Sequence, residues 1–97
     1  MLERFPGAWV AFRPDMPNVL YFTQLVANRC AIEHAEMGLD EGLLVVDIPI
    51  PDCDEAAPHA IPADAKTYLP LPKDVRAVSV QLTYVDGTQS DVRTFRR

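Results

Sequence analysis

The amino-acid sequence predicts a mostly β protein, a small antiparallel β-sandwich that ends in a hairpin over residues 77–95. The clearest indication is residues 77–85, where apolar and small polar side chains alternate with the period of two that typifies a half-buried strand. Several other short apolar runs are separated by proline-rich turns, as in all-β folds. Because 97 residues with 48 % apolar content suffice for one small core, we expect a single domain over 1–97.

The C-terminal hairpin has a conflict in its register. Asp86-Gly87 predicts the turn, because glycine accepts the positive φ of tight hairpin turns. The return strand is then expected from Asp91 to Phe95. With a two-residue loop Phe95 faces the core, but so does the acidic Asp91. An extra residue resolves the conflict, so we expect a β-bulge between Thr88 and Asp91.

The N-terminal part contains one predicted strand, Ala8 to Phe12, bounded by Pro-Gly on one side and Pro-Asp on the other. Trp9 is the single tryptophan of the chain. Large aromatic side chains are mostly buried, so we expect Trp9 to anchor the core. The alternative is an exposed tryptophan that forms a platform for a carbohydrate or a peptide.

Residues 19–39 decide the fold class. Their beginning, Val19 to Phe22, is β-branched and aromatic and favours a strand. Placed on a helical wheel, the apolar residues spread over about half of it, with Arg29, Glu33 and Glu36 among them, so an amphipathic stripe is missing. We therefore expect two strands with a break near residues 27–29.

The alternative for the same segment is one helix. Asn18 can cap a helix, Gly38 can end one, and residues 24–37 contain good helix formers. The alternative fold class is then α+β, with one helix at about 19–37 packed on an antiparallel sheet.

The middle of the chain predicts one more strand and a long loop. Leu43 to Ile50 is a nearly continuous apolar run and predicts a strand, whereas residues 52–65 are rich in proline and acid and predict a surface loop. Tyr68 to Pro72 is expected to be extended. Prolines guard both Ile48 to Pro51 and Tyr68 to Pro72, so we expect these segments at sheet edges. Five or six such strands suit an immunoglobulin- or fibronectin-like sandwich in a general way, without a motif that identifies a family.

The charge distribution excludes several classes of ligand. Nine Lys and Arg stand against 14 Asp and Glu, a net charge of −5, and residues 30–65 contain no Lys or Arg. Such a surface repels nucleic acid and anionic lipid, so we expect neither as a partner. No apolar stretch reaches the roughly 18 residues of a membrane span. The first seven residues lack the apolar segment of a secretory signal, so a chain that starts at Met1 is expected in the cytoplasm; for a module of a larger protein the sequence indicates no compartment.

Two Cys-His pairs are the sharpest candidates for chemistry. Cys30 precedes His34 by four residues, and Cys53 precedes His59 by six. Two thiols and two imidazoles are a zinc ligand set, and a small zinc-binding domain is therefore an alternative function. The short Cys-x2-Cys spacing of specific zinc motifs is absent, and a strand would place Cys30 and His34 about 13 Å apart. We expect no metal site and no cofactor.

The two cysteines have a second alternative, a disulfide. It would close a loop of about 24 residues and stabilise the fold by about 3 kcal/mol in the chain-entropy estimate. That requires an oxidising compartment. We favour the simpler expectation that Cys30 is a small buried hydrophobe and Cys53 an exposed thiol.

Catalysis is not expected. The cysteines and histidines supply residue types for a nucleophile and a base, so a small hydrolase-like enzyme is the second alternative. However, the chain contains no Gly-x-Ser-x-Gly motif, and its four glycines are too few for a nucleotide-binding loop.

The remaining resource of a small sheet protein is its edges and surface. We expect a non-catalytic binding or accessory module that contacts a protein partner, or a second copy as a homodimer, through edge-strand pairing or an apolar patch. The candidate edges are Ala8 to Phe12 and Asp91 to Phe95. The candidate binding residues on them and beside them are Trp9, Arg93, Phe95 and Arg96.

Overall fold

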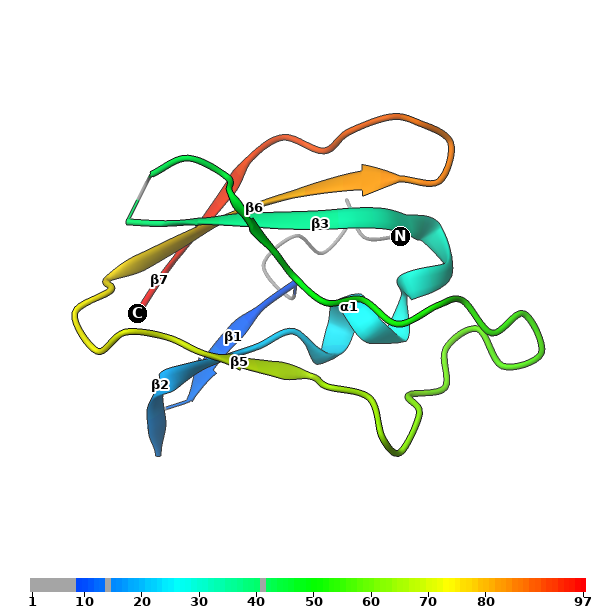
Figure 1. Cartoon of the computed structure of the whole chain (residues 1–97), viewed down its shortest axis with the longest axis horizontal. Helices are drawn as coiled ribbons and strands as arrows, with labels where there is room; N and C mark the ends of the chain where they lie inside the picture. Colours follow the sequence, from blue (N-terminus) through cyan, green and yellow to red (C-terminus); the bar gives the residue numbers. More distant parts are fainter. Residues whose placement is uncertain (1–8, 14, 41) are drawn as a thin grey trace.

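The computed structural model describes residues 9–13, 15–40 and 42–97 and contains two antiparallel sheets (Figure 1). The first has the strand order β1-β2-β5, with β1 at Ala11–Arg13, β2 at Met16–Tyr21 and β5 at Tyr68–Pro70. The second has the order β4-β3-β6-β7, with β4 at Val46–Asp47, β3 at Ile32–Leu39, β6 at Ala77–Tyr84 and β7 at Arg93–Arg96. Strands account for 39 % and helices for 9 % of the structure, so the prediction of a mostly β fold is confirmed.

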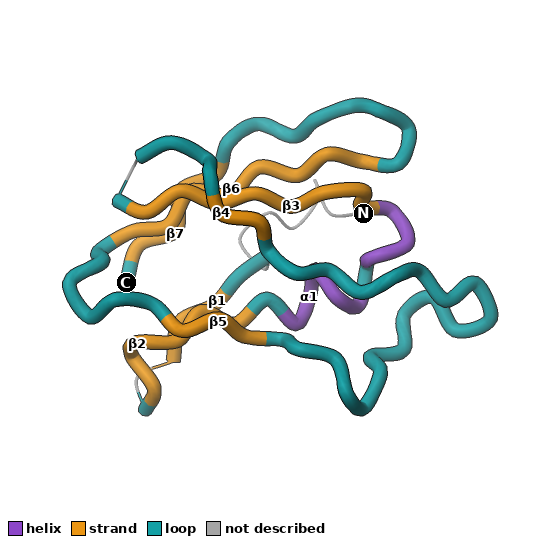
Figure 2. The backbone as a smooth tube through the Cα atoms, viewed as in Figure 1, coloured by secondary structure: helices purple, strands orange, loops and turns teal. Residues whose placement is uncertain are grey.

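The chain crosses between the two sheets three times. After β2 it passes through the one-turn helix α1 (Thr23–Ala27) and the 3-10 turn η3 (Arg29–Ala31) into β3. It returns after β4 through a long loop to β5, and crosses again to β6 (Figure 2). Residues 52–65 form the long surface loop that the sequence predicts. Among the described residues, no helix has the length and apolar character needed to cross a membrane.

The core lies between the sheets. Val78, Val80 and Leu82 of β6 are fully buried, as the alternation of that strand predicts. Trp9 is also fully buried and packs against Phe95, with ring centroids 6.3 Å apart, so its expected role as a core anchor is confirmed. The other buried hydrophobic residues of the cluster are Val10, Leu20, Phe22, Leu25, Val26, Ile32, Ala35, Met37, Ile48, Leu71 and Val75.

Residues 19–39 form two strands, as expected, and the single helix at about 19–37 is wrong. The break is longer than residues 27–29, because α1 and η3 occupy it. The helix is short but buries Leu25 and Val26 completely, and apolar burial rather than helix propensity holds so short a helix. In β3 the register shifts between Ile32 and His34, which allows both Ile32 and Ala35 to face the core.

The predicted strand over Leu43 to Ile50 is largely wrong. Only β4 pairs with β3, through two residue pairs. Before it, the Val45 amide donates to the Leu43 carbonyl at 2.9 Å, a tight turn that leaves the ladder. After it, the prolines at 49 and 51 end the pairing. The apolar run therefore begins with an exposed turn, and near its other end Ile48 is buried in the core.

A bulge is present in the C-terminal hairpin, but the extra residue lies between Ser90 and Arg93 and not at the expected position between Thr88 and Asp91. Thr83 pairs with Gln89 and Val80 with Arg93, and the return strand has one more residue than β6 between these pairs. At the bulge the Ser90 hydroxyl accepts a hydrogen bond from the buried Leu82 amide at 2.9 Å, so a side chain replaces the main-chain partner. The Asp86 carboxylate accepts hydrogen bonds from the Thr88 hydroxyl and amide, which lower the pKa of Asp86 below its usual value.

The proline-guarded segments lie at sheet edges, as predicted. β4 is an outer strand of the four-stranded sheet, and β5 is an outer strand of the three-stranded sheet. β7 and β1, which contain parts of the two candidate pairing segments, are the outer strands on the opposite sides. All four are short, with two to four residues each.

Candidate binding surface

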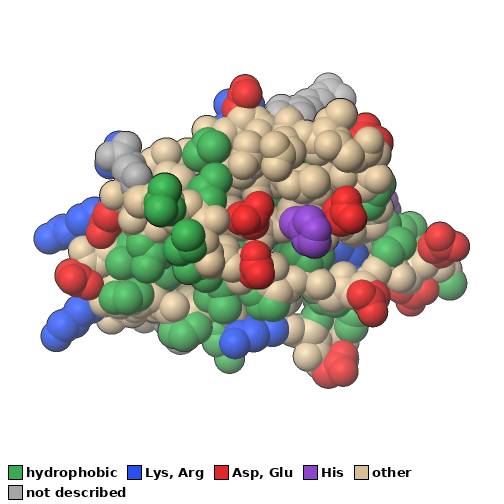
Figure 3. Space-filling view, turned by 45° about the horizontal axis from the view of Figure 1, so that its top comes forward, with side chains coloured by type: hydrophobic (Ala, Val, Ile, Leu, Met, Phe, Trp, Pro, Cys, Tyr) green, Lys and Arg blue, Asp and Glu red, His purple; other side chains and the backbone are tan. Residues whose placement is uncertain are grey.

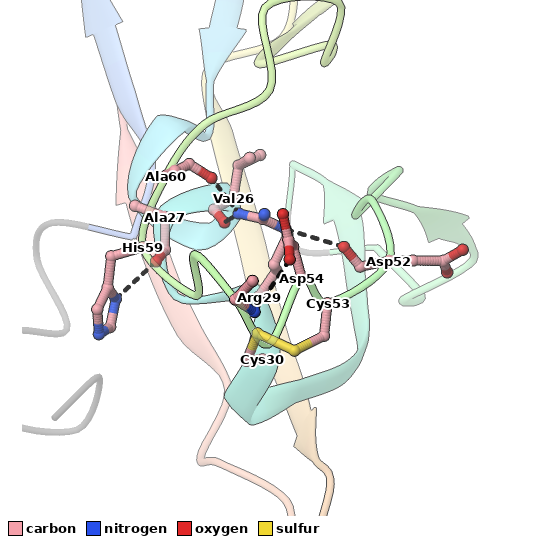
Figure 4. Close-up of a disulfide and its surroundings, with 10 residues drawn as sticks. Val26, Ala27, Arg29, Cys30, Asp52, Cys53, Asp54, His59 and Ala60 are labelled. Carbon is pink, nitrogen blue, oxygen red and sulfur yellow. Dashed lines mark hydrogen bonds between the residues drawn. A yellow bond between two sulfur atoms is a disulfide. The ribbon is translucent and has the colours of Figure 1, made fainter.

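The two cysteines form a disulfide, so the expectation of a buried hydrophobe and a free thiol is wrong. Cys30 and Cys53 are 23 residues apart in sequence, and their Cα atoms are 4.7 Å apart (Figure 4). The disulfide joins η3 to the beginning of the long loop. Because both sulfur atoms are bonded to each other, neither is a thiolate ligand or nucleophile in this structure.

The two histidines do not join the cysteines. His34 is exposed on β3, opposite Thr83 of β6. His59 Nδ1 lies 2.9 Å from the Ala27 carbonyl oxygen, at the end of α1 (Figure 4). Within the described ranges, no group of three or more His, Cys, Asp and Glu side chains is placed to hold a metal ion.

Arg29 has a structural role that the sequence reasoning missed. Its side chain is only 2 % exposed. The guanidinium donates through Nε to the Asp52 carbonyl at 2.9 Å and through Nη1 to the Val26 and Ala60 carbonyls at 3.0 and 2.6 Å. A buried charge is costly unless it is hydrogen-bonded, and here main-chain oxygens supply the bonds. Its position among apolar residues of the helical wheel was the available signal.

Residues 27–30 therefore bind the long loop through three kinds of contact. These are the disulfide, the Arg29 hydrogen bonds and the contact of His59 with the Ala27 carbonyl. The disulfide joins two side-chain sulfur atoms, and the Arg29 and His59 side chains contact main-chain carbonyl oxygens. The arrangement suits a scaffold that fixes a loop.

The other candidate binding residues surround the core. Trp9 is buried, so it is not the surface platform of the alternative reading. Phe95 is half-buried against it. On the same strand Arg93 is half-buried and Arg96 is exposed. Of the two aromatic residues proposed from sequence, Trp9 is fully buried and Phe95 is partly covered by it.

An apolar patch lies instead on the outer face of the four-stranded sheet. We use this name for Leu43, Val45 and Val92, whose side chains are 81 %, 75 % and 49 % exposed. Leu43 and Val92 line a groove of about 420 Å³ together with Gly42, Leu44, Ser79 and Thr94, whereas Val45 follows in the chain and is not part of the lining. Figure 3 shows hydrophobic side chains gathered on this side of the molecule, next to acidic side chains and a histidine. Monomeric proteins seldom expose several large aliphatic side chains together without a use.

Gly38, near the end of β3, and Asp40, directly after it, determine where the patch lies. At Gly38 an added Cβ would lie 2.5 Å from the Gly42 carbonyl oxygen and 2.7 Å from that of Leu43, so the turn rests directly on the glycine. Asp40 adopts a left-handed φ of 49°, which reverses the chain. Its Oδ1 accepts hydrogen bonds from the amides of Arg76 and Ala77 at 2.7 and 3.0 Å.

The floor of the groove and its acidic neighbours follow from the register of the sheet. Ser79 pairs with Gly38 on one side and Thr94 on the other, and the Ser79 and Thr94 hydroxyls share a 3.1 Å hydrogen bond. Glu36 lies two residues before Gly38 on β3 and therefore on the same face of the sheet. It is directly opposite Asp47 of β4. Two carboxylates therefore lie beside the groove, in a cross-strand relation that is in general unfavourable for like charges.

The other surface features are more isolated. A second groove of about 310 Å³ lies among three prolines, Ile50 and residues 64–66, where the long loop folds back. Tyr68 and Val85 are exposed, but neither lines one of these two grooves. The exposed position of Leu43 and Val45 was not expected from the sequence, because both lie in an apolar run that predicts a strand. The glycine at 42, directly before them, was the signal of a turn.

No protein family, no curated protein and no solved structure matches the chain. The proposals below therefore depend on the geometry of this molecule alone.

Replacing both Cys30 and Cys53 with alanine is expected to lower the free energy of unfolding by about 3 kcal/mol, because the unfolded chain loses a closed loop of about 24 residues. Urea denaturation monitored by the fluorescence of buried Trp9 measures the change. Reducing the wild-type disulfide should reproduce it, and Glu55→Gln, an exposed change in the same loop, should not. A loss below about 1 kcal/mol would show that the disulfide does not constrain the fold.

Proposed function

We propose that the protein is a non-catalytic binding module that contacts a protein partner through the apolar patch. The observation that carries this proposal is the exposure of Leu43 and Val92, which line one groove, with Val45 exposed two residues after Leu43. Removing apolar surface from water is favourable by roughly 25 cal/mol per Å², a gain that the free protein leaves unused here. A partner that covers the patch removes this apolar surface from water and gains that free energy.

Contacts on both sides of the turn support the same function. The carbonyl oxygens of Gly42 and Leu43 lie close to Gly38, and the Asp40 carboxylate accepts hydrogen bonds from the amides of Arg76 and Ala77 at the start of β6. Contacts that order a binding surface before a partner arrives reduce the conformational entropy lost on binding. The two alternatives, a small zinc-binding domain and a small hydrolase-like enzyme, have no comparable geometric support among the described residues.

Edge-strand pairing, the other mode expected from sequence, has weaker support. β4 and β5 run into prolines, and β1 and β7 have only three and four residues. Short strands and prolines are the usual protection of an edge against pairing. We therefore place the contact on the sheet face and leave the edges as a minor contribution.

The strand order supports the finer fold assignment, an immunoglobulin- or fibronectin-like sandwich. Strands consecutive in sequence alternate between sheets in three places, and a three-stranded sheet faces a four-stranded one. Such sandwiches commonly serve as recognition modules, but this analogy concerns architecture and leaves the site to the residues themselves.

The disulfide supports a compartment different from the cytoplasm expected for a chain starting at Met1. Disulfides persist in oxidising surroundings and are rare in the cytosol. We expect Cys30 and Cys53 to resist alkylation when cells are lysed directly into a thiol reagent without reductant. If mass spectrometry detects the alkylated form of both cysteines, the protein resides in a reducing compartment.

A photo-crosslinking amino acid at position 43 is expected to yield a discrete covalent adduct with another protein in cells that express the chain. The same amino acid at position 85, also exposed but not in the groove lining, is the matched control and should yield none. Val92→Ser should abolish the adduct while changing the free energy of unfolding by less than about 0.5 kcal/mol, as for most exposed sites. Equal adducts at 43 and 85, or none at 43, would overturn the proposed function.

A further inference from the structure

The groove takes an apolar side chain better than a polar one. Leu43 and Val92 stand on its two sides, and Ser79 and Thr94 form its floor. The two floor hydroxyls are hydrogen-bonded to each other, so they do not require a polar group from a ligand. A volume of about 420 Å³ accommodates one or two large side chains of a partner.

The charges around the groove differ at its two ends. Glu36 lies on the sheet face two residues from Gly38, about 7 Å along the strand, with Asp47 opposite it. Arg96 is exposed on β7, two residues beyond Thr94 in the other direction. A ligand that follows the strands therefore meets two carboxylates at one end and a guanidinium at the other.

We propose that the groove binds an extended segment of a partner protein that carries an apolar side chain and, two residues away, a lysine or arginine that contacts Glu36 and Asp47. This inference rests on the proposed function and adds the chemistry of the partner. A cation that contacts both carboxylates donates charge-assisted hydrogen bonds to them, which are stronger than bonds between neutral groups. The spacing of two residues follows from the distance of about 7 Å along the sheet.

A second copy of the chain fits this description less well. Each copy carries a net charge of −5, so two copies repel each other at long range. Arg93 and Arg96, which flank Phe95 in an extended segment, already belong to β7 of the same sheet. A separate, basic protein segment supplies both the missing charge and the missing apolar side chain.

The test is selection of a displayed library of random twelve-residue peptides on the immobilised, disulfide-bonded protein. We expect the enriched sequences to share a large apolar residue with Lys or Arg two positions from it. Synthetic versions of the best binders are then titrated against the wild type and three variants: Leu43→Ser, Glu36→Gln with Asp47→Asn, and Glu55→Gln as the matched control. Glu55 is an exposed acid of the long loop, and this loop extends from the end of the molecule away from the turn between β3 and β4 (Figure 1).

The expected result has two parts. Leu43→Ser abolishes measurable binding, and Glu36→Gln with Asp47→Asn weakens it about three- to tenfold, because each exposed ion pair contributes modestly. Replacing the peptide cation with glutamine gives the same loss in the wild type and no further loss in the doubly neutralised variant. Glu55→Gln leaves the affinity unchanged.

Other outcomes separate the two proposals. Peptides without a basic preference that depend on Leu43 but not on Glu36 and Asp47 would overturn the charge inference and leave the binding module in place. Peptides that bind independently of Leu43 and Val92 would overturn both. Self-association in sedimentation that Leu43→Ser abolishes would identify a second copy as the occupant and overturn the inferred partner.

Discussion

The absence of a side chain at Gly38 is the constraint on which the surface of this protein depends. The carbonyl oxygens of the next turn lie where a Cβ would be, at 2.5 and 2.7 Å, so any other residue must push the turn away from the sheet. Asp40 closes the same turn with a left-handed φ and two hydrogen bonds to main-chain amides. Together they lift Leu43 and Val45 out of the β ladder and hold them at the surface.

The opposite end of the molecule is held by different chemistry. The disulfide and the buried Arg29 guanidinium fix the long loop, which has too little apolar content and too many acids to pack on its own. This loop bears acidic side chains but lacks the aliphatic cluster of the patch. The protein thus has a long loop fixed by a disulfide and by hydrogen bonds at one end, and a sheet face with exposed aliphatic side chains at the other.

The sequence predicted those parts of the fold in which one local pattern decides. The alternation of β6 gave its buried face, the misplaced Asp91 indicated the bulge, and the prolines marked two edge strands. The disulfide was not predictable, because whether two distant thiols meet depends on the path of the loop between them. The patch was missed for a related reason. Leu43 and Val45 have the composition of a strand, and only the contact with Gly38 decides otherwise.

The most direct test of this account is carbene footprinting of the free protein at low micromolar concentration, with labelling at each residue measured by mass spectrometry. A preformed patch predicts strong labelling of Leu43 and Val45, far above that of the buried Val78 and Val80 in the same sheet. Labelling of Leu43 and Val45 as weak as that of the core residues would contradict the account. It would mean that this segment is covered in the free protein, and that the groove is not available to a partner.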